Sequence, residues 1–156
     1  MKTLADAFEH TLKDIYYAEK AILKAGPKAE KAVKTADLKK AISDHMAETK
    51  EQVKMLEGVF ATIDVKPAGE KCDAIEGLIK ECEGIIEDAQ GEALEAAVIG
   101  ALQAIEHYEI ARYGTLREWA NTLGNTEAAD QLGRILDMEK AANNKLTGIA
   151  VSTING

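Results

Sequence analysis

Apolar residues recur at helical spacing along almost the whole chain, and the strict alternation that is typical of a half-buried strand appears nowhere. Alanine is abundant and only two prolines occur, which favours helix throughout. The pattern predicts four long helices and a shorter one between the two pairs, over about 3–34, 38–63, 74–88, 92–122 and 125–151. We therefore expect an all-α protein.

Residues that are typical of turns separate these segments. We expect Gly26-Pro27 to bend or interrupt the first helix, because proline lacks the backbone N–H that a helix interior needs. Asp37 is the expected N-cap of the second helix. The stretch 64–73, which contains a proline and a glycine, ends that helix, and Gly124 is expected to cap the C-terminus of the helix before it.

The lengths of the connections predict the topology. A short turn joins the first two long helices, a short turn joins the last two, and the stretch 64–91 between the pairs is long enough to cross the whole bundle. That order is typical of a ferritin-like four-helix bundle with a long crossover that carries a short extra helix. We expect residues 1–156 to form a single domain.

Composition restricts the classes of partner. The net charge of −8, without a basic run, argues against nucleic acid and against anionic membrane surfaces. The apolar runs are too short to span a bilayer, and the first residues lack the features of a signal peptide, so the expected location is the cytoplasm. Cys72 and Cys82 are expected to be reduced thiols, and no pair of C-x-x-C motifs encodes a rubredoxin-type iron site.

Four polar residues interrupt the apolar stripes of the four long helices: Glu19, His45, Glu109 and Glu139. A helix advances about 100° per residue, so each of these residues falls in the sector that its apolar neighbours occupy. A carboxylate or an imidazole on a buried face is costly unless a partner, a proton or a metal ion compensates it. Four such residues on four helices predict one shared site inside the bundle.

Two motifs add further candidates one helical turn away. His45 and Glu48 form H-x-x-E, and Glu106 and Glu109 form E-x-x-E, so each pair lies on one helix face. Glu109 and Glu139 lie at similar distances from the Gly124 turn, which places them at one level of the bundle. The same count on the other hairpin favours Glu48 over His45 as the partner of Glu19.

Carboxylates with one imidazole suit iron or manganese, and two such ions together can reduce oxygen or peroxide. The candidate metal ligands are Glu19, His45, Glu48, Glu106, Glu109 and Glu139. The candidate cofactor is a di-iron centre or manganese.

Structural roles compete with this interpretation. His45 alone would more often be a core histidine with satisfied hydrogen bonds, and Glu48 or Glu106 could be boundary residues that reach water. Glu139 could form a buried ion pair with Arg112 or Arg134. Three tyrosines on the stripes favour core packing with a hydroxyl hydrogen bond over a radical role, namely Tyr16, Tyr108 and Tyr113.

Several blocks of the sequence resemble the YciF/YciE-like bacterial stress proteins. They are 12–20 (LKDIYYAEK), 45–49 (HMAET) with Gln52, 72–79 (CDAIEGLI), 106–116 (EHYEIARYGTL), 139–141 (EKA) and 145–147 (KLT). The resemblance implies a ferritin-like, rubrerythrin-related bundle that forms a homodimer and takes part in stress responses. It also carries the six candidate ligands over to the same positions.

Two departures from the rubrerythrin pattern leave function open. Rubrerythrin-type sites use E-x-x-H on the second and fourth helices. Here the second helix carries the reverse order, H-x-x-E, from His45 to Glu48, and the fourth has Ala142 three residues after Glu139. One hypothesis is a stress protein whose metal site consumes oxygen or peroxide. The other is a structural or interaction protein without a working centre, and iron storage ranks third because nothing in the sequence favours a large shell.

Overall fold

The computed structural model describes residues 1–155, which form helices and no strand. The helices are α1 (Leu4–Ala32), α2 (Ala36–Ala61), α3 (Asp73–Asp88), α4 (Gly91–Thr122) and α5 (Thr126–Ile149), and α5 continues into a π-helical turn, η1 (Ala150–Ile154). The all-α prediction is confirmed, and the boundaries of the helices agree with the sequence-based ones to within a few residues.

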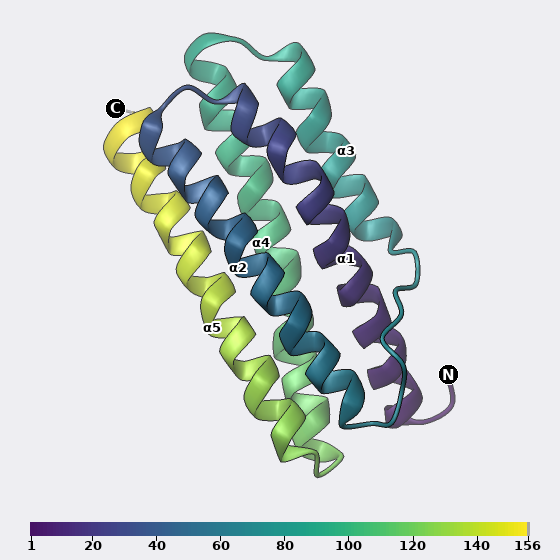
Figure 1. Cartoon of the computed structure of the whole chain (residues 1–156). Helices are drawn as coiled ribbons and strands as arrows, with labels where there is room; N and C mark the ends of the chain where they lie inside the picture. The colour runs from purple at the N-terminus through teal and green to yellow at the C-terminus, as the bar shows by residue number, and fades with distance from the viewer. Residues whose placement is uncertain (156) are drawn as a thin grey trace.

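The four long helices pack into one bundle, as Figure 1 shows. α1 and α2 form one antiparallel hairpin, and α4 and α5 form the other. The crossover that follows α2 returns along the bundle and leads into α3, which packs against α1 and α4. Because of this crossover, α2 and α4 run in the same direction, and the predicted ferritin-like topology is confirmed.

α1 starts at a capping box and runs unbroken past Pro27. Of the two expected outcomes, a bend or an interruption, the interruption is therefore wrong. The Thr3 side chain accepts a hydrogen bond from Asp6 N, and the Asp6 carboxylate accepts one from Thr3 N. Burial beyond the proline, at Ala29 and Val33, stabilises the helical path and offsets the hydrogen bond that Pro27 cannot make.

A side chain of α4 stabilises the turn between α1 and α2. The prediction that Asp37 is the N-cap of α2 is wrong. Thr35 is the N-cap, while Asp37 lies in the first turn. The Glu95 carboxylate accepts hydrogen bonds from Thr35 N at 2.8 Å, from Thr35 Oγ1 at 2.6 Å and from Lys34 N. A side chain from another helix therefore satisfies donors that a local cap would otherwise bind.

The apolar core is divided into two clusters along the bundle axis. One cluster surrounds Phe8, Leu12 and Phe60, and the other surrounds Leu38 and Val98. Along each long helix the candidate ligands lie between residues of the first cluster and residues of the second. The fold thus places a polar layer between two apolar ones.

No helix in the described part of the chain is both long enough and apolar enough to cross a membrane. Cys72 and Cys82 are free and buried, as expected for reduced thiols.

Candidate metal centre

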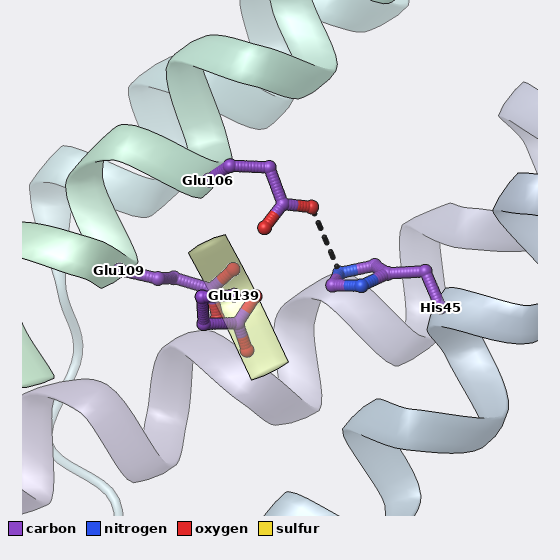
Figure 2. Close-up of side chains that lie close together, drawn as sticks. All are labelled: His45, Glu106, Glu109 and Glu139. Carbon is purple, nitrogen blue, oxygen red and sulfur yellow. Dashed lines mark ion pairs between the residues drawn. The ribbon is translucent and has the colours of Figure 1, made fainter. Parts of the chain in front are cut away.

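Four of the predicted ligands meet inside the bundle. His45 comes from α2, Glu106 and Glu109 come from α4, and Glu139 comes from α5. One ligand atom from each of these side chains lies within 4.8 Å of the ligand atoms of the other three. Figure 2 shows the four side chains pointing toward one another from three helices.

Glu19 brings α1 to the same layer. Its side chain is fully buried, and its Oε1 accepts a hydrogen bond from the Tyr113 hydroxyl of α4. Burial and the charge of the neighbouring Glu139 raise the pKa of Glu19. All four long helices therefore contribute a metal-type side chain to this layer.

Most polar atoms of this layer lack a hydrogen-bond partner in the protein. Within residues 1–155, the buried side-chain atoms without a hydrogen bond are Glu19 Oε2, both ring nitrogens of His45, both amide atoms of Gln52, Glu106 Oε2, and both carboxyl oxygens of Glu109 and Glu139. Each buried polar group of this kind costs about 1–3 kcal/mol when it stays unsatisfied. Four of these side chains, His45, Glu106, Glu109 and Glu139, bring ligand atoms within 4.8 Å of one another, so a bound cation there would satisfy several of them together.

Burial also determines the protonation of the carboxyl groups. Removal from water raises the pKa of Glu19 to about 8 and that of Glu106 to about 11, and neighbouring carboxylates add to both shifts. The pKa of Glu109 is raised well above its usual value for the same reasons, and burial raises that of Glu139. Without a cation, most of these buried carboxyl groups are therefore expected to hold a proton and to be neutral.

The imidazole of His45 is neutral, because burial lowers its pKa to about 4. Its Nε2 lies 3.3 Å from Glu106 Oε1, the approach that Figure 2 marks, although the geometry is not that of a hydrogen bond. The two pKa shifts together describe a neutral ring beside a protonated carboxyl group. A neutral imidazole with a free lone pair is the form that binds metal.

Glu48 lies outside this cluster. Its side chain is 46% exposed, and its Oε2 is 4.0 Å from His45 Nδ1. The structure thus brings His45, and not Glu48, to the other ligands, although the count along the helices favoured Glu48. Three residues along a helix amount to only about 4.5 Å. The direction in which each side chain points around the helix axis therefore determines which residue reaches the cluster. Glu48 lies away from the centre of the apolar stripe and does not reach it.

Of the structural roles considered for single residues, the geometry fits only a boundary position for Glu48, whose side chain is 46% exposed. Glu106 is 2% exposed and is not a boundary residue, and neither ring nitrogen of His45 is satisfied by the described protein atoms. Residues 1–155 contain no ion pair between Glu139 and an arginine. Arg112 instead lies over the ring of Tyr108, 5.3 Å from its centroid.

The tyrosines pack as expected, each with a polar partner for its hydroxyl. Tyr16 donates to Glu57 Oε1 at 3.1 Å, and the Tyr108 hydroxyl lies 2.9 Å from Cys72 Sγ. Tyr113 differs from these two, because its partner Glu19 belongs to the polar layer.

Sequence reasoning missed two residues of the site. Gln52 is fully buried, has no hydrogen-bond partner among the described residues, and lies close enough to Glu139 to oppose the rise in its pKa. Gln52 lies on the same helix face as His45, and this spacing is the sequence signal that could have identified it as a site residue. Tyr113 was placed in the core by its stripe, but only the packing of α4 against α1 shows that its hydroxyl reaches Glu19.

Comparison with known proteins gives consistent matches over nearly the full length. The family described as Domain of unknown function (DUF892) matches residues 3–156. Protein YciF of Escherichia coli K12 is 41% identical over 99% of this chain and 95% of its own length. The crystal structure of that stress protein superposes with a TM-score of 0.95 over 99% of both chains.

Two further solved structures are similar. YcfI of Rhodopseudomonas palustris, described as a putative structural protein, is 46% identical over 94% of both chains, with a TM-score of 0.90. A protein of Xanthomonas campestris is 20% identical over 98% of this chain and 95% of its own, with a TM-score of 0.79, and shares the fold.

Proposed function

The chain belongs to the DUF892 family, and on that premise we propose that it is a stress-response protein that binds a pair of iron or manganese ions between its long helices. The proposed ligands are Glu19, His45, Glu106, Glu109 and Glu139, with Glu48 as an additional ligand from the rim. The YciF homologue is a stress protein, which supports the physiological part of the proposal.

The observation that carries the proposal is the set of unsatisfied polar atoms in one buried layer. Both oxygens of Glu109 and of Glu139 are buried without a partner in the described chain, at the same place as both nitrogens of His45. Structural polar residues in a core are normally hydrogen-bonded to protein. Groups left open toward one common point are what a ligand cage requires.

The donor set matches the proposed metals. Carboxylates with an imidazole are hard and intermediate donors that suit iron and manganese, and the layer has no thiolate. The four buried carboxylates Glu19, Glu106, Glu109 and Glu139 would together carry the charge that balances two divalent ions. Balance of this kind matters because an uncompensated charge at such depth is very costly.

The protein's own groups have clear tasks in this proposal. The carboxyl groups give up their protons when the cation binds, while His45 is already neutral. Tyr113 holds Glu19 in place, and Gln52 lies beside Glu139. The apolar clusters above and below the layer keep water out.

When bound, such ions would supply redox chemistry toward oxygen or hydrogen peroxide, which we propose as the oxidant. A homodimer is the proposed assembly.

Metal analysis of protein purified without chelator tests the proposal. We expect iron or manganese in the wild-type protein and after loading in solution, and loss of most of it in Glu109→Gln, which keeps the shape of the side chain. Glu118→Gln is the matched control, because Glu118 is exposed on the same helix. Peroxide consumption should follow the metal content.

Absence of stoichiometric iron or manganese in the wild-type protein, even after loading, would overturn the proposal. Equal metal content in Glu109→Gln would remove the assigned site.

A second candidate function is a structural protein whose centre no longer binds metal. The observation that favours it is the single ligand on α5, since Glu139 is followed one turn later by Ala142. The R. palustris relative is itself described as a putative structural protein. In this case protons alone compensate the buried carboxyl groups, and peroxide consumption does not differ between wild type and Glu109→Gln.

A further inference from the structure

A cavity of about 130 Å³ lies inside the bundle, directly beside the candidate metal centre. All four long helices line it, and two of the centre's own residues form part of its wall. The lining includes Ile22 of α1, Ile42 and His45 of α2, Leu102 and Glu106 of α4, and Leu146 of α5. The cavity therefore lies between the polar layer and the apolar cluster around Leu38 and Val98.

Small residues leave this space unfilled. Ala41 and Ala142 line it at positions where larger side chains would occupy the space. Gly26 also lines it, but Met46 already fills the space next to its Cα. Protein interiors normally close-pack, and voids that exceed a few water molecules are few in a domain. A space of this size next to a buried donor cluster is consistent with a site kept open for a ligand.

The chemistry of the lining restricts the class of ligand. Most of the wall is aliphatic, whereas the polar groups are concentrated at two places. At the inner end are His45 Nε2, which has no hydrogen bond to described residues, and Glu106, which is 2% exposed and has an unpartnered Oε2. These two groups are the convergent polar contacts that a small-molecule pocket typically has.

At the outer end, Asp44, Glu48 and Lys145 line the opening. Asp44 Oδ2 lies 2.8 Å from Lys145 Nζ and 2.7 Å from Lys40 Nζ. Glu48 is close enough to Lys145 for that cation to oppose the rise in its pKa, so the two cations and the two carboxylates at the opening balance. An anionic ligand would gain no net attraction at this opening and would lose its hydration beside a mainly aliphatic wall, whereas a neutral ligand would not pay that cost.

We propose that this cavity binds a neutral, mainly apolar organic molecule of about the size of benzene, with one end against His45 and Glu106. A dry apolar cavity of about 150 Å³ is known to accept benzene. The proposal deepens the proposed function by naming an organic ligand for the same centre, and it rests on that function only for what happens at the metal. Binding itself requires the cavity alone.

Methyl NMR of the full chain, prepared free of metal, tests the proposal. Benzyl alcohol is the neutral probe, and benzoate is the anion with the same carbon skeleton. We expect benzyl alcohol to shift the methyl signals of Ile42 and Leu146, with benzoate binding at least about tenfold more weakly. Ile79 and Ile86 line a neighbouring apolar groove on the α3 side and do not line the cavity, so shifts confined to them would report binding in that groove instead.

Two substitutions locate the ligand. Ala142→Leu places a larger side chain in the cavity and should weaken benzyl alcohol binding by at least about tenfold, a loss equivalent to about 1.4 kcal/mol. Ala47→Leu is the matched control, since Ala47 is exposed on α2 and does not line the cavity. Ala141→Leu, at the exposed rim, should also weaken binding and provides a second test if Ala142→Leu does not fold.

Unchanged Ile42 and Leu146 signals would overturn the proposal. So would equal binding of benzoate, unweakened binding in the variant that folds, or shifts confined to Ile79 and Ile86. The two proposals fail separately. If the protein takes up metal but does not bind benzyl alcohol, this inference alone is removed. If the metal-free protein binds benzyl alcohol but takes up no iron or manganese after loading, the proposed function alone is removed.

Discussion

At the scale of the residue, Glu19 has one oxygen bonded to the Tyr113 hydroxyl and the other without a partner, in a position closed to solvent. Burial raises its pKa from 4.5 to about 8. The unfolded chain therefore gives up this proton at lower pH than the folded one. The stability that the protonated group confers is complete below about pH 4.5 and is lost as the pH rises through about 8.

The expected result is that metal-free wild-type protein loses stability relative to Glu19→Gln when the pH is raised from 5 to 9. A shift of this size corresponds to a relative loss on the order of 3 kcal/mol. Urea unfolding of both proteins at the two pH values measures it. A pH-independent difference between the two proteins would show that Glu19 is not held protonated.

Removal of the Tyr113 hydroxyl should destabilise the protein more than removal of another tyrosine hydroxyl. In Tyr113→Phe both oxygens of Glu19 become unpartnered at full burial, which is expected to cost about 1–3 kcal/mol. Tyr16→Phe is the control, because its partner Glu57 is exposed and can bind water instead. Equal losses in denaturant unfolding would contradict the assigned role of Tyr113.

At the scale of the element, the sequence predicts the helices well because their apolar stripes are long and regular. It fails where the outcome depends on contact with another element. Pro27 stays within α1 because packing on both sides offsets its missing bond, and Thr35 takes the N-cap position in a turn that Glu95 of α4 stabilises. Neither contact is visible within one segment of the sequence.

The candidate site, like the helices, could be predicted where the signal lies within one segment and not where it depends on contacts between elements. Glu19, His45, Glu109 and Glu139 were identifiable because each interrupts an apolar stripe. The choice between His45 and Glu48 was not, because a count along helices ignores the direction in which each side chain points. The cavity beside the centre was also beyond reach, since it depends on how four helices leave space together.

Glu95 gives a test at this scale. In Glu95→Ala, the donors at Thr35 and Lys34 lose their acceptor, so the turn between α1 and α2 should loosen. We expect a loss of about 1–2 kcal/mol in the free energy of unfolding and faster amide hydrogen exchange at the start of α2. Glu118→Ala, on the exposed face of α4, should change neither quantity much. Exchange rates equal to those of the wild type would show that Glu95 does not stabilise the turn.

At the scale of the whole molecule, the polar layer joins all four long helices, so metal binding should stabilise the fold as a unit. Addition of Mn²⁺ to metal-free protein is expected to raise Tm, because the ion binds only the folded chain. The increase should be larger at pH 8 than at pH 6, since protons compete for Glu19 and Glu106.

Scanning calorimetry with and without Mn²⁺ at both pH values measures this effect. EDTA should reverse it, and Glu109→Gln should show little of it. A larger increase of Tm at pH 6 than at pH 8 would contradict the assignment of the buried carboxyl groups as ligands.

The crossover between α2 and α4 has a consequence for biosynthesis. It divides the ligands between two hairpins, and Glu139 lies on the second helix of the second hairpin. A nascent chain on the ribosome that has emerged only as far as α4 holds three of the four clustered side chains but has no α5 to close the layer. Under the proposed function, metal would therefore enter only after α5 has left the exit tunnel and docked, so the ions would meet a completed bundle.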